Sequence, residues 1–144
     1  DYEWRGVVFP SVVKYYPQLA IYTPINPYWG FSVPRDVPEE VIEQFVEAFV
    51  YAVSQERFRE AIDSRGIIFA PMMGTAADQT VAKVSAARGW PQYELGITEN
   101  SPANWGIPPI TEWTWPPHEK AANVRPWPAI AEELYAKELA KYNE

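Results

Sequence analysis

The sequence contains no cysteine among its 144 residues. Disulfide bonds, thiolate-ligated zinc, iron–sulfur clusters and thiol nucleophiles are therefore excluded, because all of them need that side chain. His118 is the one histidine, so a cluster of histidine metal ligands cannot form. The motifs G-x-S-x-G, P-loop and G-x-G-x-x-G do not occur either. We therefore expect a protein that is not an enzyme and that has no metal and no cofactor.

Basic residues are also scarce. Twelve Lys and Arg oppose nineteen Asp and Glu, which gives a net charge of −7. Such a chain repels a phosphate backbone, so we predict no nucleic-acid partner. No apolar run approaches the ~20 residues that a membrane helix needs, and the first residues lack the basic-then-apolar pattern of a signal peptide. Because the sequence starts with Asp1, we interpret it as a processed chain or as a fragment.

Apolar and aromatic residues are plentiful, at 47% and 15%. This composition predicts an ordered core, and the length favours one domain. Fifteen prolines make up roughly 10% of the chain, about twice ordinary usage. We divide the fold into residues 1–92, an α/β region, and residues 93–144, a wrap rich in Pro and Trp with a terminal helix packed on it.

Four longer helices are predicted. The clearest spans residues 38–53, because Pro38 suits a first helical position, Glu39 and Glu40 favour the helix dipole, and apolar residues recur every three or four positions. Its buried face should contain Ile42, Phe45 and Phe49. The other three helices are expected at residues 55–65, 75–88 and 128–142, and a brief one between Pro10 and Pro17.

The ends of two of these helices are marked by particular residues. Gly66 should end the second helix. Thr75 and Asp78 resemble a capping box at the start of the third helix. Gly89 and Pro91 should close that helix.

Three apolar segments are predicted to be extended. Residues 19–23 and 28–33 are rich in β-branched and aromatic residues, and a corner with two prolines at residues 24–27 separates them. Residues 67–70 form a short apolar run that ends before Pro71, which is typical of a buried strand. We therefore expect an α/β fold in which three to four helices pack on a small sheet of these segments.

Residues 93–128 contain seven prolines and four of the seven tryptophans. Two interpretations remain open for this segment. Its rings could dock on the helices, or they could form a flat surface that binds a glycan or a partner protein. We favour the docked tail, and we regard the same rings as a candidate surface for self-association.

Residues 28–66 contain a distinctive succession of phrases. Trp29 and Gly30 form an aromatic–Gly segment, Pro34 and Pro38 precede a long helix, the phrase SQERFREAI follows a break, and Gly66 closes the pattern. This succession resembles the C-terminal portion of the substrate-binding proteins of tripartite tricarboxylate transporters, also called Bug receptors. The upstream phrase VFPSVVKYYPQLA and the downstream phrase IIFAPMMGTAADQTVAKVSA extend the resemblance over residues 7–89.

The resemblance implies the C-terminal region of a two-lobed fold like that of periplasmic binding proteins, located in the periplasm or otherwise outside the cytoplasm. Such a protein binds a small organic carboxylate and delivers it to membrane permease subunits. Tyr28 and Trp29 are the matched positions that could reach a ligand cleft. The alternatives are the interaction module described above and, more remotely, a hydrolase that uses His118.

Overall fold

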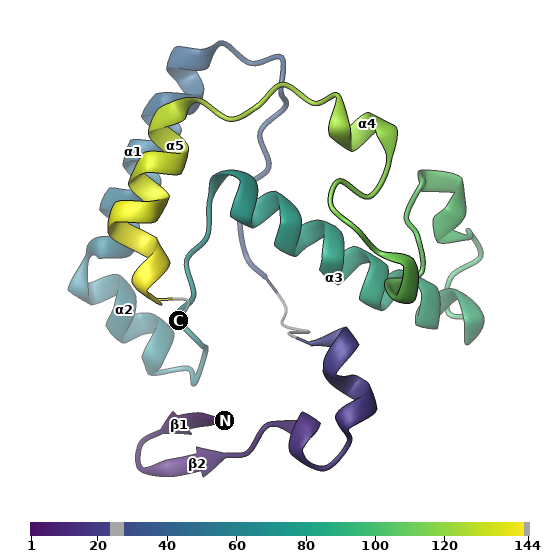
Figure 1. The fold of residues 1–144 in the computed structure, drawn as a ribbon. Coiled ribbons are helices and arrows are strands. Elements are labelled where there is room, and N and C mark those ends of the chain that lie inside the picture. Colours follow the sequence, from purple (N-terminus) through teal and green to yellow (C-terminus); the bar gives the residue numbers. More distant parts are fainter. Residues whose placement is uncertain (24–27, 143–144) are drawn as a thin grey trace. The chain divides into compact units, whose positions relative to one another are not determined.

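The computed structural model describes residues 1–23 and 28–142. The chain is 57% helical and has a two-stranded antiparallel sheet (Figure 1). Its contacts define two compact units: unit 1 comprises Asp1–Trp29 and Gln79–Asn123, and unit 2 comprises Gly30–Asp78 and Val124–Glu144. Helix α3 (Gly74–Glu94) begins in unit 2 and continues in unit 1. The predicted boundary between residues 92 and 93 falls inside α3, and that division stays a prediction.

Unit 1 begins with a β-hairpin. Strand β1 (Tyr2–Trp4) pairs with β2 (Val7–Phe9), and Tyr2 lies opposite Phe9. Arg5 and Gly6 both have positive φ angles, 52° and 76°, as a tight hairpin turn requires. Two 3₁₀ helices follow, η1 (Val12–Lys14) and η2 (Pro17–Tyr22). The brief helix predicted between Pro10 and Pro17 is therefore present as η1.

The rest of unit 1 packs short elements on α3. These elements are η3 (Pro102–Trp105), η4 (Ile110–Glu112) and α4 (Glu119–Ala122). The core consists of Ala86, Ala87 and Ile110, and half-buried apolar side chains cover it, namely those of Tyr22, Ile107 and Trp113. Because the two alanines have short side chains, irregular segments can approach the helix closely.

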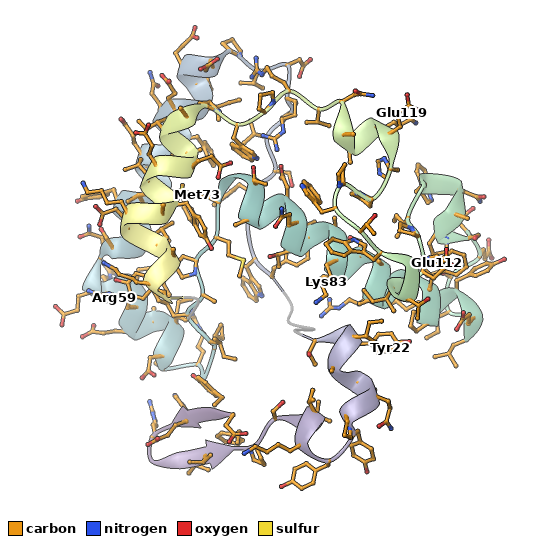
Figure 2. All side chains as sticks on the ribbon, in the orientation of Figure 1. Tyr22, Arg59, Met73, Lys83, Glu112 and Glu119 are labelled. Atoms are coloured by element: carbon orange, nitrogen blue, oxygen red, sulfur yellow. The ribbon has the colours of Figure 1, made fainter. Side chains whose placement is uncertain are left out.

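Unit 2 is built on two adjacent helical segments (Figure 1). Helix α1 (Glu39–Ser54) packs against α5 (Ala129–Leu134), which continues as a π-helical turn, η5 (Tyr135–Leu139), and a 3₁₀ turn, η6 (Ala140–Tyr142). Helix α2 (Glu56–Asp63) follows α1. The predicted helices at 38–53, 55–65 and 128–142 are thus confirmed, with ends shifted by at most two residues. The buried core residues of the unit are Ile42, Val46, Val53, Met73, Ala131 and Leu139 (Figure 2 labels Met73).

The buried face of α1 differs in part from the prediction. Ile42 is only 2% exposed, as expected, but Phe45 is 42% exposed and Phe49 is half-buried. Val46 and Val53 occupy the core instead. The apolar residues of α1 cover more than one face, so periodicity alone did not determine which of them contacts α5.

The predicted position of the sheet is wrong. Residues 19–22 belong to the 3₁₀ helix η2, and residues 28–33 and 67–70 are in no helix or strand. Pro17 fixes a helical φ at the start of η2, which favours the turn over a strand. A strand also depends on a paired neighbour, and the segments 28–33 and 67–70 pair with no described part of the chain. The predicted corner at residues 24–27 lies outside the described residues.

The predicted end of the third helix is also wrong. Helix α3 continues through Gly89 and Pro91 to Glu94. Tertiary contacts hold this last part: Trp90 Nε1 donates to the carbonyl of Ile107 at 3.0 Å, and a Cβ at Gly89 would lie 3.3 Å from Pro102 Cγ. Packing thus overrides the helix-stopping preferences of Gly and Pro.

Candidate functional site

Tyr28 and Trp29, the predicted ligand-binding residues, lie on the surface. Their exposed fractions are 53% and 87%, and neither belongs to a helix or strand. Both rings are therefore accessible to a ligand. Their role in binding stays a prediction.

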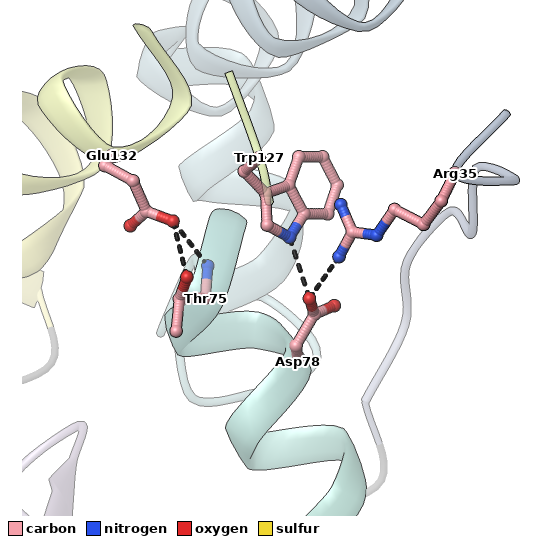
Figure 3. Close-up of polar contacts among 5 residues, drawn as sticks. All are labelled: Arg35, Thr75, Asp78, Trp127 and Glu132. Atoms are coloured by element: carbon pink, nitrogen blue, oxygen red, sulfur yellow. Dashed lines mark hydrogen bonds and ion pairs between the residues drawn. The ribbon is translucent and has the colours of Figure 1, made fainter. Parts of the chain in front are cut away.

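A polar cluster surrounds the first turn of α3 within unit 2 (Figure 3). Asp78 Oδ2 accepts a hydrogen bond from Trp127 Nε1 at 2.8 Å and forms an ion pair with the Arg35 guanidinium. That guanidinium lies 3.9 Å from the centroid of the Trp127 ring, which is a cation–π arrangement. Three segments distant in sequence therefore meet at one carboxylate oxygen.

A second carboxylate binds the start of the same helix. Glu132 Oε1 of α5 accepts from the Thr75 backbone N at 2.9 Å and from Thr75 Oγ1 at 2.6 Å (Figure 3). It satisfies one of the free N–H groups at the helix start and places negative charge there. Gly74 has a φ of +62°, and a Cβ at this position would lie 2.9 Å from Glu132 Oε1. The backbone conformation favours glycine, and a side chain here would also displace the Glu132 carboxylate.

This cluster has a structural role, because its polar contacts join segments of unit 2. Its carboxylates already accept hydrogen bonds from groups of the same unit, and the Arg35 side chain is only 22% exposed. The cluster fixes the start of α3 to the segment before α1 and to α5. The backbone amide and the hydroxyl of Thr75 together form a donor set that suits a carboxylate, as their hydrogen bonds to Glu132 show.

The sequence did not reveal this cluster. Thr75 and Asp78 were predicted to cap α3 together, but Thr75 binds Glu132 and Asp78 binds Arg35 and Trp127. The partners are separated by 43 to 57 residues. No periodicity or local motif connects residues at such separations.

An apolar hollow of about 160 Å³ lies on the outer side of α1 in unit 2. Its lining consists entirely of apolar side chains, those of Phe31, Phe45, Ala48, Phe49 and Ala52. The rings of Phe31 and Phe45 meet edge to face at 5.5 Å between centroids. Phe31 is 78% exposed, so the hollow opens to solvent.

The tryptophans of residues 93–128 have different environments. Trp113 packs against the core of unit 1, and Trp127 packs against the core of unit 2. Trp105 is 71% exposed and Trp115 is 37% exposed. The docked-tail prediction therefore describes Trp113 and Trp127 but not Trp105.

His118, the remaining catalytic candidate, has a local role at a helix start. Its Nδ1 accepts from the Ala121 backbone N at 3.1 Å, so the imidazole caps the short helix α4. Over the described ranges 1–23 and 28–142, His, Asp and Glu side chains form no group of three that could hold a metal ion. Within the same ranges, every helix is too short or too polar to cross a bilayer.

Comparisons with protein-family models, with curated proteins and with solved structures give no match. Functional inference for this chain therefore rests on its own residues and geometry.

Proposed function

We propose that this chain is the C-terminal region of an extracytoplasmic solute-binding protein that delivers a small organic carboxylate to membrane permease subunits. The order of its elements is the main support. Helix α1 follows Pro34 and Pro38, α2 follows directly, Gly66 has a left-handed φ of +66°, and α3 comes after a short apolar segment. Apart from the strand expected at residues 67–70, which the structure lacks, this is the succession expected for the receptors that the sequence resembles.

The proposed mechanism is binding without chemistry. Amide and hydroxyl donors would hold the carboxylate of the solute, and the lobes would close about a hinge. The exposed rings of Tyr28 and Trp29 would contact its apolar part. The 144-residue chain alone is expected to bind neither citrate, malate nor terephthalate, because the resemblance places most carboxylate-binding loops outside this sequence.

Native mass spectrometry of the parent protein that contains this chain, purified from its own host, tests the proposal. We expect a retained adduct with the mass of a small carboxylic acid, and we expect Tyr28→Ala and Trp29→Ala to reduce it. Tyr51→Ala is the control, since Tyr51 is 70% exposed but belongs to α1. A protein that retains no acid and is not stabilised by any di- or tricarboxylate would contradict the proposal.

One observation favours a second function, that of a glycan-binding module. Trp105 is 71% exposed in a Pro-rich segment, and flat exposed rings suit stacking on sugars. Titration with a soluble oligosaccharide such as cellohexaose, followed by tryptophan fluorescence, tests it. A saturable change that Trp105→Ala abolishes and Trp29→Ala preserves would support this function, and no change would exclude cellohexaose as the ligand.

A further inference from the structure

Helix α1 carries an apolar strip that the core does not use. Val41, Phe45, Ala48 and Ala52 are four, three and four residues apart, so they align along one side of the helix. All four are exposed, Val41 at 45% and Phe45 at 42%. The core of unit 2 uses a neighbouring side of α1, which contains Ile42, Val46 and Val53. Folding of the unit therefore does not account for the strip.

The strip is shaped to receive a side chain. Ala48 and Ala52 leave space between the rings of Phe31, Phe45 and Phe49, and this space is the hollow of about 160 Å³. An apolar cavity of about 150 Å³ holds a benzene-sized group. The hollow therefore has room for one large apolar side chain, such as Leu or Phe.

The charge of α1 specifies the kind of partner. Between Glu39 and Ser54 the helix carries four glutamates and no Lys or Arg. Glu40 and Glu47 are exposed and seven residues apart, so they lie on the same side of the helix as each other, and Gln44 and Tyr51 lie between them and the strip. A partner with apolar residues along one face and basic residues beside them would match both features.

We propose that the outer face of α1 is a docking surface for a basic amphipathic helix of a partner protein, whose apolar anchor fills the hollow lined by Phe31, Phe45 and Ala48. The inference is independent of the solute-binding function. An anionic lipid surface is disfavoured, because the helix carries four glutamates without a basic residue and the chain has a net charge of −7. Docking of α1 on the α1 of a second copy is disfavoured for the same reason.

Two synthetic helical peptides test this proposal. They share one ridge of Leu with a single Trp anchor, and the flanking positions are Lys in the first peptide and Glu in the second. We expect saturable binding of the Lys peptide by fluorescence anisotropy, weakened by added salt, and binding at least about tenfold weaker for the Glu peptide.

Substitutions in the protein locate the surface. Ala48→Glu should weaken binding of the Lys peptide about tenfold or more by blocking the hollow, and Glu40→Lys with Glu47→Lys should have a similar effect through charge. Glu56→Lys with Glu60→Lys in α2 is the matched control, because both residues are exposed outside α1. Ala48 is itself exposed, so thermal melting should show that Ala48→Glu folds normally.

Several outcomes would overturn the proposal. Equal binding of the Lys and Glu peptides would remove the charge argument. Binding that survives Ala48→Glu would place the contact elsewhere. Sedimentation that shows a dimer lost in Ala48→Glu would identify the occupant as a second copy of this chain rather than a basic partner.

Discussion

The two units bury different kinds of surface. In unit 2, long aliphatic side chains interlock between α1 and the α5–η5 segment, and Ile42 and Leu139 are each 2% exposed. In unit 1, Ala86 and Ala87 present a nearly flat helix face, and Ile110 with half-buried side chains from irregular segments covers it. The first arrangement depends on the fit between two regular helices. The second arrangement depends on the positions of individual side chains from irregular segments, such as Tyr22 and Trp113.

The units also differ in the groups that side chains of α3 bind in other segments. In unit 2, Asp78 binds the side chains of Arg35 and Trp127. In unit 1, side chains of α3 donate to backbone carbonyls: Trp90 Nε1 to Ile107 O at 3.0 Å, and Lys83 Nζ to Thr23 O at 2.9 Å. A single substitution can therefore remove either partner of the Asp78 contacts, but only the donor of these two contacts in unit 1.

The largest effect is expected from truncation in the helix–helix core. Ile42→Ala removes a side chain that is 2% exposed against α5 and should cost about 2–5 kcal/mol. Val41→Ala, next to it but 45% exposed, should change stability by no more than about 0.5 kcal/mol. Urea unfolding gives both values. Equal effects of the two substitutions would mean that α1 does not pack through the face that contains Ile42.

A smaller effect is expected from overpacking in unit 1. Ala86 is 0% exposed, so Ala86→Leu must displace the segments that cover α3 and should cost about 1–3 kcal/mol. Ala52→Leu on the exposed side of α1 is the matched control. Urea unfolding with tryptophan emission as the signal checks the result. If the two substitutions prove equally mild, unit 1 lacks the close packing that its alanines indicate.

The sequence predicts the regular helices of unit 2 better than the elements that depend on contacts from distant residues. Local signals sufficed for α1, because Pro38, two early glutamates and repeated apolar spacing agree with the helix observed. They failed at the end of α3, because the contacts of Gly89 and Trp90 come from residues farther along the chain. They also failed for residues 67–70, since apolar composition does not supply a strand with a partner.

The polar cluster shows a similar limit. The identity of Thr75 and Asp78 indicated hydrogen bonding at a helix start, and both residues do bond there. Their partners could not be predicted, because Arg35 and Glu132 come from other segments. The exposed strip on α1 was missed for another reason. Phe45 fits a core pattern as well as Val46 does, and only the position of α5 separates them.

The cap that Glu132 of α5 provides at the start of α3 should contribute moderately to the stability of unit 2. Glu132→Ala removes the acceptor of both Thr75 donors and should cost about 0.5–2 kcal/mol, as the loss of a helix cap does. Glu133→Ala is the control, because Glu133 is exposed one residue away. Hydrogen exchange at the Thr75 amide should accelerate only in Glu132→Ala. Unchanged protection there would show that the carboxylate does not hold this amide in solution.

The smallest effect is the expected difference in stability between substitutions of two tryptophans, one in each core. Trp127 Nε1 donates to Asp78 at 2.8 Å, whereas Trp113 Nε1 is buried with no acceptor among the described residues. Replacement by Phe removes a similar ring area from both sites, but it breaks a hydrogen bond only at Trp127. At Trp113 it removes a buried donor that lacks a partner, which offsets part of the lost packing. Trp127→Phe should therefore destabilise the chain by about 1 kcal/mol more than Trp113→Phe, a difference kept modest by the 36% exposure of Asp78. Paired urea titrations measure this difference, and a larger loss at Trp113 would mean that its indole N–H has an acceptor in solution.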